Sequence, residues 1–331
     1  MLPTLQYRRI ATVDEAVALA KEEGHRFLAG GIELLPLLKE GLQDAETLLD
    51  LAPLKASLGQ VEVTREGGRV GALASLQEVA RHPAIKSHYR ALAQACRLTA
   101  SLQIRQQGTL AGNLLQINRC EYFRNNYGCY LQGGDTCLAS QGDDRHHALW
   151  TEGTCHSVYP SDPATALVAL GAKVRWRDAE GEKEAPLEEL FGRPVPEDPR
   201  HLKLPQGALM TGIHLPPAPT WSVFLKVMER GTWTFSAVSL AASARLEGDL
   251  LRDVRIVLGG VAARPWRAEG AEALLEGAEV EVLEGVGEIF PEMSRSLLEG
   301  LRPGRENGYK LALLQGLFAK ALADLRGALG R

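Results

Sequence analysis

The sequence predicts an α+β fold, in which small sheets are covered by helices, for a chain of 331 residues. Three observations predict it: strand-like and helix-like segments alternate over the first 57 residues, a hairpin pattern follows at 58–80, and strands precede helices in the last third. The length suits two or three domains. The 45% hydrophobic and 24% charged residues are ordinary for a globular protein with a sizeable core.

The first 57 residues contain the pattern of a small βαβ unit. Residues 14–20 have helical spacing, and an apolar segment at 27–31 ends in two glycines. Residues 33–39 then read as a helix and 48–51 as a buried strand. The order strand, glycine turn, helix, strand predicts a βαβ arrangement.

The middle of the chain alternates between regular and irregular patterns. A hairpin is predicted from 61–64 and 70–73, and a helix over 87–102. A second glycine-containing loop follows at 107–113. Residues 118–156, rich in Asn, Gly, Asp, Tyr and His, are predicted to be irregular, and so long a loop is uncommon unless something holds it.

Regular structure is predicted again after residue 160. Residues 160–164 cap an apolar helix, a strand follows at 172–176, and a proline-rich linker at 215–219 marks a domain boundary. Beyond the linker we expect an antiparallel sheet covered by helices, with strands at 223–227, 236–244 and 254–258 and helices at 267–275 and 308–325. The predicted domains are 1–57, 58–216 (with an insertion at 118–157) and 220–331.

Charge and hydropathy argue against binding to nucleic acids and to membranes. The net charge of −4 gives no attraction to nucleic-acid backbones or anionic lipid. No apolar run reaches the roughly 18 residues of a membrane helix, and the N-terminus lacks a signal-peptide core. We therefore expect a cytoplasmic protein that binds neither nucleic acid nor membrane.

The two glycine loops, about 80 residues apart, suggest backbone amides that converge on an anion, since glycine lets the backbone approach a phosphate closely. Each loop alone more often only turns the chain. Neither is the G-x-G-x-x-G fingerprint of a Rossmann domain or a Walker loop.

Together the loops resemble a known family. Residues 28–36 resemble the first FAD loop of the flavin subunits of molybdenum hydroxylases, which include xanthine dehydrogenase and carbon monoxide dehydrogenase, and 103–114 resemble the second. Ser161-Asp162 looks like a third element, and segments within 224–312 are similar to the family's C-terminal domain. The resemblance implies a two-subdomain FAD-binding fold of the p-cresol methylhydroxylase/vanillyl-alcohol oxidase type plus a C-terminal α+β domain.

The resemblance also implies an FAD site, with an electron-transfer role and no catalytic acid or base in this chain. The residues it assigns to FAD are Ala29, Gly30, Gly31, Ile32, Glu33, Leu34, Thr109, Ala111, Gly112, Asn113, Asp162 and Lys226. Ile32 and Ala111 depart from the family pattern, where a hydroxyl residue and a glycine are usual. The plainer interpretations are a helix N-cap for Asp162 and a solvated strand-end charge for Lys226.

Four of the five cysteines fall within 36 residues: Cys120, Cys129, Cys137 and Cys155. Four thiolates can bind zinc or a 4Fe–4S cluster, and the spacing fits neither a C-x-x-C pair nor a ferredoxin motif. The segment resembles the 4Fe–4S insertion of the 4-hydroxybenzoyl-CoA reductase β subunit, which implies a cluster with these four ligands. A structural zinc site and unligated thiols are the alternatives. The fifth, Cys96, is expected in a helix core.

The chain has no residues expected to hold molybdenum cofactor or a 2Fe–2S cluster. The resemblance therefore implies a heterotrimer, or a dimer of trimers, with a molybdenum-cofactor subunit and a 2Fe–2S subunit. A ferredoxin-like donor would supply electrons through the cluster and FAD for reductive dehydroxylation of an aromatic acyl-CoA. The alternatives are a xanthine dehydrogenase-like or carbon monoxide dehydrogenase-like hydroxylase, and a zinc-stabilised scaffold with a degenerate flavin site.

Overall fold

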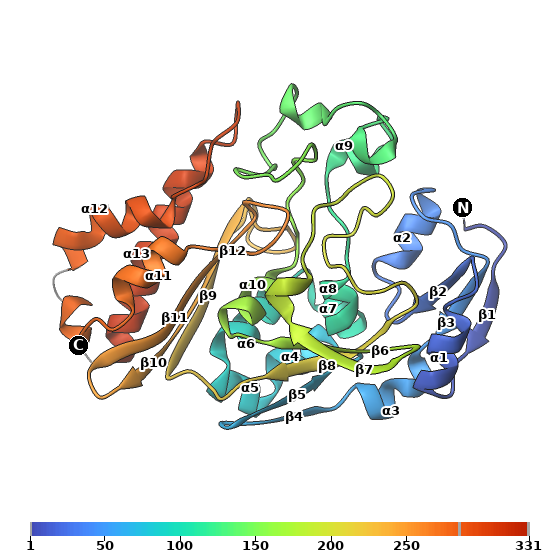
Figure 1. Ribbon diagram of the computed structural model, residues 1–331, viewed down its shortest axis with the longest axis horizontal. Coiled ribbons are helices and arrows are strands. Elements are labelled where there is room, and N and C mark those ends of the chain that lie inside the picture. Colours follow the sequence, from blue (N-terminus) through green and yellow to red (C-terminus); the bar gives the residue numbers. More distant parts are fainter. Residues whose placement is uncertain (1, 284–285, 330–331) are drawn as a thin grey trace.

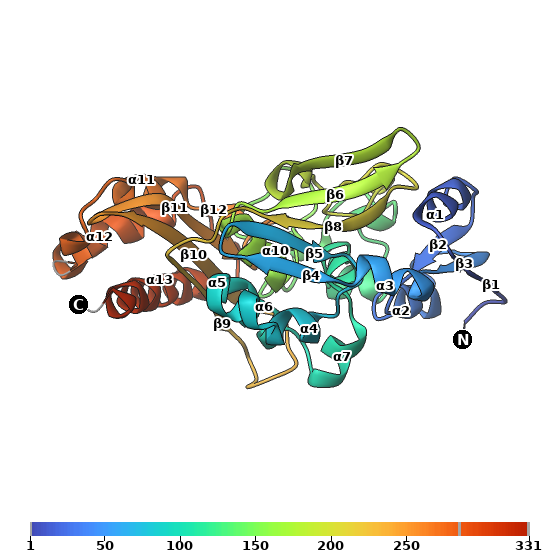
Figure 2. The same cartoon turned by 90° about the horizontal axis from the view of Figure 1, so that it is seen from below.

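Three separate sheets organise the chain, and the computed structural model describes residues 2–283 and 286–329 of it. The sheets lie in a row, with the N-terminal unit and the C-terminal helices at opposite ends and a five-stranded sheet between them (Figures 1 and 2). Helix and sheet are thus mixed as predicted. No helix among the described residues has the length and apolar character needed to cross a bilayer.

The N-terminal unit is a three-stranded parallel sheet with strand order β1-β3-β2. Thr12 caps its first helix by accepting a hydrogen bond from the Glu15 amide at 3.1 Å. The predicted βαβ pattern is confirmed, and the second strand ends directly before the first glycine loop. The elements are β1 (Gln6–Arg9), α1 (Val13–Leu19), β2 (His25–Leu28), α2 (Leu34–Lys39) and β3 (Thr47–Asp50).

The central part is a five-stranded antiparallel sheet in the order β4-β5-β8-β6-β7, with helices packed against it. The predicted hairpin near residues 61–73 is confirmed as β4 and β5. The strands are β4 (Val61–Thr64), β5 (Gly67–Gly71), β6 (Lys173–Asp178), β7 (Gly181–Pro186) and β8 (Leu209–Leu215). The helices are α3 (Lys55–Leu58), α4 (Leu76–Arg81), α5 (Pro83–His88), α6 (Arg90–Leu98), α7 (Leu102–Gln107), α8 (Leu110–Leu114) and α10 (Asp162–Ala169).

The single helix predicted over residues 87–102 is wrong, because the chain breaks twice. Tyr89 leaves helical geometry (φ −128°, ψ 54°) and buries its ring, with its hydroxyl donating to the Pro216 carbonyl at 2.7 Å. Ala100 adopts a positive φ of 49° at the second break. Arg105 holds this turn by donating to the carbonyls of Thr99 and Ala100.

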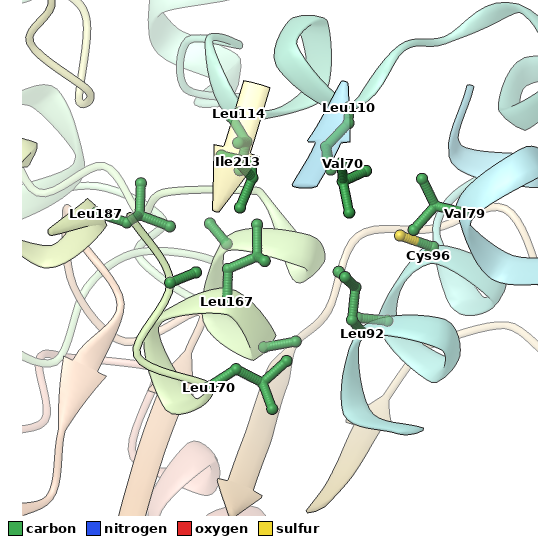
Figure 3. Close-up of a cluster of buried hydrophobic side chains, with 14 of the residues drawn as sticks. Val70, Val79, Leu92, Cys96, Leu110, Leu114, Leu167, Leu170, Leu187 and Ile213 are labelled. Atoms are coloured by element: carbon green, nitrogen blue, oxygen red, sulfur yellow. The ribbon is translucent and has the colours of Figure 1, made fainter. Parts of the chain in front are cut away.

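Helix α10 is buried on every side, between the central and C-terminal sheets. Figure 3 shows Leu167 and Leu170 of α10 in one core with Leu92, Ile213 and other apolar side chains. Cys96 lies in the same core with no exposed surface, which confirms its predicted place. Residues at the start of α10 are thereby fixed between two sheets.

The C-terminal part is a four-stranded antiparallel sheet in the order β12-β11-β10-β9, covered by helices as predicted. Its apolar core is distinct from the other two. The domain boundaries proposed at 57/58 and 216/220 stay predictions. The elements are β9 (Trp221–Val227), β10 (Val238–Glu247), β11 (Leu250–Gly259), β12 (Trp266–Arg267), α11 (Glu269–Leu275), α12 (Val286–Leu297) and α13 (Tyr309–Ala328).

Residues 118–157, here called the cysteine segment, run along one edge of the molecule between the N-terminal and C-terminal parts (Figure 1). Apart from α9 (Glu121–Arg124) and two 3-10 turns, the segment has no regular structure, in agreement with the irregular pattern of the sequence.

Candidate cofactor site

The first glycine loop presents a row of free backbone amides. In the described structure the amides of residues 30–34 donate to no protein acceptor. Gly31 has φ +71°, a conformation that favours glycine and turns successive amides toward one side. Such a row can bind an anion, and a dinucleotide diphosphate has the charge and the acceptor oxygens for it.

The two glycine loops lie against each other although 77 residues separate them. The Gln107 side chain donates to the Gly30 carbonyl at 3.3 Å. A Cβ built on Gly30 would fall 2.0 Å from the Gln107 carbonyl oxygen, so only glycine allows this approach. The side chain of Ile32 also lies beside Gly108 and is 37% exposed. The sequence-predicted loops are thus brought together.

The second loop uses its amides within the protein. The amides of Leu110 and Ala111 donate to the carbonyls of Ala74 and Ala72, and the Gly112 amide donates to the Thr109 hydroxyl at 3.1 Å. The Asn113 amide also bonds to Thr109. The second loop therefore offers side chains and a close wall, while the free amides belong to the first.

Asp162 and Lys226 form a buried ion pair. Lys226 Nζ lies 2.7 Å from Asp162 Oδ2, and the two side chains are 1% and 5% exposed. The ammonium also donates to the carbonyls of Leu98 and Thr234, so its three protons all have acceptors. The plainer interpretations are wrong: Lys226 is not solvated, and the side chain that caps α10 belongs to Ser161, which accepts from the Ala164 amide.

Ser161 connects this pair to the second loop, because its hydroxyl donates to Asn113 Oδ1 at 2.6 Å. Ser236 donates to the other oxygen of Asp162 at 3.0 Å. Asn113, Ser161, Asp162, Ser236 and Lys226 therefore form one polar chain from the second loop to strand β9. It brings together three elements that the sequence places about 50 to 110 residues apart.

Glu33 of the first loop binds two arginines that sequence reasoning missed. Its carboxylate accepts hydrogen bonds from Arg119 and from Arg124, the latter at 2.9 Å, and from the Ile117 amide at 3.2 Å. Both arginines flank Cys120. No local spacing indicates this pairing, which depends on contacts across 86 and 91 residues.

Three of the four predicted cysteine ligands, Cys120, Cys129 and Cys155, lie in one small apolar cluster with side chains such as Phe123 and Leu131. Cys129 and Cys137 are buried, and Cys120 and Cys155 are half-buried. Burial raises the pKa of the Cys120 thiol to about 12 and that of Cys155 to about 11, and the negative charges of the other segment cysteines act in the same direction. The cysteines are therefore near enough to influence one another's ionisation.

Four thiols in one region are a donor set for either a zinc ion or an iron–sulfur cluster. Among residues 2–283 and 286–329, no three His, Cys, Asp or Glu side chains converge closely enough to hold a single metal ion. A tetrahedral zinc site needs sulfurs about 2.3 Å from the metal. An iron–sulfur cubane is several atoms across and holds its thiolates farther apart.

The end of the cysteine segment is clamped to the C-terminal part. Asp144 accepts hydrogen bonds from the amides of Arg305 and Glu306 at 2.7 and 2.8 Å. Lys310, at the start of α13, donates to the carbonyls of His147 and Gly260. Burial lowers the pKa of Lys310 to about 7. His147 in turn lies 3.2 Å from Cys120 Sγ through Nε2.

Two hollows border the cysteine segment, and neither is lined by the glycine loops. One of about 430 Å³ lies beside Leu42, Phe123 and Pro196, and one of about 120 Å³ lies beside Trp150 and Cys155. We place the anion site at residues 30–34 because of the free amides there. The volume of a pocket alone does not show which kind of ligand it binds.

Comparisons with known proteins indicate the same family over almost the whole chain. Residues 3–218 match the family model described as the FAD binding domain in molybdopterin dehydrogenase, and 223–325 match the CO dehydrogenase flavoprotein C-terminal domain. The aldehyde oxidoreductase FAD-binding subunit PaoB of Escherichia coli is 34% identical, over 97% of this chain and 98% of that protein. A xanthine dehydrogenase FAD-binding subunit of Escherichia coli O157:H7 is 22% identical over 100% and 99%.

Solved structures share the fold. A chain of the carbon monoxide dehydrogenase of Hydrogenophaga pseudoflava superposes with a TM-score of 0.74 at 21% identity, covering 98% of this chain and 97% of that one. A chain of quinoline 2-oxidoreductase from Pseudomonas putida 86 gives 0.75 at 19% identity, over 100% and 99%. The predicted fold class is confirmed.

Proposed function

The chain belongs to the family of FAD-binding subunits of molybdenum hydroxylases, and on that premise we propose that it carries electrons between an FAD held by its two glycine loops and a 4Fe–4S cluster held by its cysteine segment. The chain is thus an oxidoreductase subunit, with FAD binding expected from its family. The cluster is the part that goes beyond the family model. The observation that carries it is that Cys120, Cys129 and Cys155 share one apolar cluster next to the first glycine loop, with Cys137 near enough to influence the ionisation of Cys120 and Cys155.

In the proposed site, the amides of residues 30–34 bind the FAD diphosphate, with Ala29 and Ile32 against the cofactor. Thr109, Ala111, Gly112 and Asn113 form the facing wall. We propose that Asp162 and Lys226 act as a pair that sets the position of the wall, because a bond from Lys226 to FAD would require breaking one of its three present bonds. Bound FAD exchanges electrons singly or in pairs, and the protein's part is placement and electrostatics.

We propose Cys120, Cys129, Cys137 and Cys155 as the cluster ligands. The influence of these cysteines on one another's ionisation supports a shared cofactor, and the resemblance of the segment to a 4Fe–4S insertion favours a cluster over a zinc ion. Burial disfavours free thiolates at Cys120 and Cys155, and a bound metal cluster would stabilise the deprotonated sulfurs. Phe123, Leu131 and their apolar neighbours would keep water from the cluster.

The proposed partners are a subunit with molybdenum cofactor and a subunit with 2Fe–2S clusters. We propose that the complete enzyme oxidises an aldehyde, because the 34% identity to an aldehyde oxidoreductase subunit extends over almost the entire chain. In that direction electrons flow outward through the FAD. Reduction of an aromatic acyl-CoA with a ferredoxin-like donor stays a prediction from the cysteine segment, and it would reverse the flow.

The cofactor content tests the proposal directly. Anaerobically purified chain should contain about one FAD and about four iron atoms, with broad absorbance beneath the flavin bands. Cys129→Ala should lose most of the iron. Cys96→Ala, which changes a buried thiol outside the segment, should keep it. Zinc in place of iron, or equal iron in both variants, would contradict the cluster, whereas chain without FAD would contradict the flavin site.

The substrate class needs the assembled enzyme. An aromatic or aliphatic aldehyde added anaerobically should bleach the FAD absorbance within the turnover time. An aromatic acyl-CoA added to the pre-reduced enzyme should leave its FAD reduced. FAD that stays oxidised with the aldehyde, and reduced FAD that is reoxidised by the acyl-CoA, would instead favour reduction of an aromatic acyl-CoA.

A further inference from the structure

Glu33 belongs to both cofactor sites. Its own amide is one of the free amides of residues 30–34, and its carboxylate is bound by Arg119 and Arg124 of the cysteine segment and by the amide of Ile117 just before it. The side chain is only 16% exposed, and both guanidinium partners are charged, which makes these hydrogen bonds stronger than neutral ones. The first glycine loop is therefore held in place by residues next to Cys120.

Arg124, one of the two arginines that bind Glu33, also fixes the backbone of Cys120. Arg124 Nε donates to the Asn118 carbonyl at 3.0 Å, and Asn118 Oδ1 accepts from the Cys120 amide at 3.0 Å. The Arg124 amide donates to the Cys120 carbonyl in the first turn of α9. Cys120 and Glu33 are thus two ends of one hydrogen-bonded unit.

Arg119 extends this unit to the C-terminal part. Its guanidinium carbon lies 5.2 Å from the centre of the Phe235 ring, and its Nε is buried without an acceptor. Phe235 lies between Thr234 and Ser236, which bond Lys226 and Asp162. Both arginines therefore contact groups whose positions define the proposed flavin site.

We infer that Arg119 and Arg124 are positioning residues that couple FAD binding at residues 30–34 to cluster assembly at Cys120. This inference rests on the proposed function. A cluster that fixes Cys120 also fixes the two guanidinium groups and, through Glu33, the amide loop. The amide loop then loses less conformational freedom when FAD binds to it. Because linkage is reciprocal, FAD must in turn favour the cluster-loaded form.

The test measures the dissociation constant of FAD, by quenching of flavin fluorescence, for the full chain with its cluster and after anaerobic removal of iron. Cluster-loaded chain should bind FAD about tenfold more tightly, within the usual range of coupling between sites. The ratio of the two dissociation constants, without and with the cluster, is therefore expected to be about ten in the unaltered chain. In Arg124→Gln and in Arg119→Gln this ratio should fall toward one. Losing a positive charge weakens anion binding in both forms alike, so the ratio isolates the coupling.

Arg145→Gln is the matched control. Arg145 lies in the same segment and carries the same charge, but its partners are Asp143 and Glu306. That variant should keep the full ratio. Glu33→Gln changes the acceptor of both arginines and should also reduce the ratio. It therefore provides the test if an arginine variant fails to fold. As a second measurement, FAD should slow iron release to a chelator in the unaltered chain and have little effect in Arg124→Gln.

Equal FAD constants with and without the cluster, in chain that binds both, would overturn the inference and leave the proposed function standing. A ratio that survives in Arg119→Gln, Arg124→Gln and Glu33→Gln would also overturn it. Chain that binds no iron or no FAD would remove the proposed function and the inference with it.

Discussion

Individual positions in the glycine loops differ in the side chains they tolerate. At Gly30 a Cβ would meet a backbone carbonyl at 2.0 Å, whereas at Gly112 its nearest neighbour would be the Thr109 hydroxyl at 3.0 Å. The sequence shows two glycine turns, and it does not show which glycine lies against the other loop.

Gly30→Ala should separate the two loops and weaken FAD binding by about 100-fold or more, because the backbone of Gln107 cannot yield as a flexible side chain would. A fluorescence titration with FAD measures the effect. The control is Gly316→Ala, in α13, where an added methyl meets nothing within 4 Å and helix propensity improves. Equal affinity in the two variants would contradict the close approach.

His201 makes stability depend on pH. The ring is fully buried, Nδ1 bonds to the Ala263 carbonyl, and burial lowers its pKa from 6.5 to about 4. Between those values the unfolded state binds the proton and the folded state does not, so stability falls as pH drops from 6.5 to 4. The full difference corresponds to about 3 kcal/mol.

His201→Gln should therefore reduce the loss of stability between pH 6.5 and pH 4 in urea unfolding, while its amide can still donate to Ala263. The rest of the loss should come from His147, whose pKa burial also lowers to about 4. His214→Gln, at a half-exposed histidine paired with Glu184, is the control and should keep the steep loss. An unchanged slope in His201→Gln would contradict the assignment.

At the scale of elements, the cysteine segment is ordered by clamps at its two ends. Glu33 holds its beginning, and Asp144, Asn307 and Lys310 hold its end against α13. Between the clamps only α9 and short turns are regular. The segment's order therefore depends on a few buried polar contacts more than on secondary structure.

Asp144→Ala should make the segment more sensitive to limited proteolysis, because two amides at Arg305 and Glu306 lose their acceptor. The neighbouring Asp143→Ala removes an exposed pair with Arg145 and should leave the digestion rate within about twofold. Mass spectrometry of the first cleavage products locates the sites. Equal rates for both variants would show that the clamp at Asp144 does not order the segment.

Most elements could be predicted from the sequence, because alternation, helical spacing and glycine turns are local signals. The meeting of the two glycine loops is expected from the family resemblance. The breaks at Tyr89 and Ala100 could not, since they follow from burial of a ring against Pro216 and from the Arg105 contacts. The pairing of Asp162 with Lys226 and of Glu33 with its arginines depends on tertiary contacts. The sequence therefore indicates the individual residues Glu33, Asp162 and Lys226, and only the tertiary structure shows their partners.

For the whole molecule, the buried Asp162–Lys226 pair joins the central part to the C-terminal sheet. Lys226→Met should lower the free energy of unfolding by about 3–5 kcal/mol, because it leaves a buried carboxylate without its cation. The half-exposed pair of Lys173 with Glu184 offers a control, and Lys173→Met should cost less than about 1 kcal/mol. Urea unfolding monitored by tryptophan fluorescence measures both, and equal losses would contradict the burial argument.

That pair also limits how such subunits can be recombined. A chimera that joins residues 1–219 of this chain to the corresponding second half of a relative would inherit Asp162 from one parent and the strand opposite it from the other. If the donor strand lacks lysine at the position of Lys226, the hybrid encloses a lone carboxylate between two sheets. Compatible parents can thus be selected by inspecting one position before any gene is assembled.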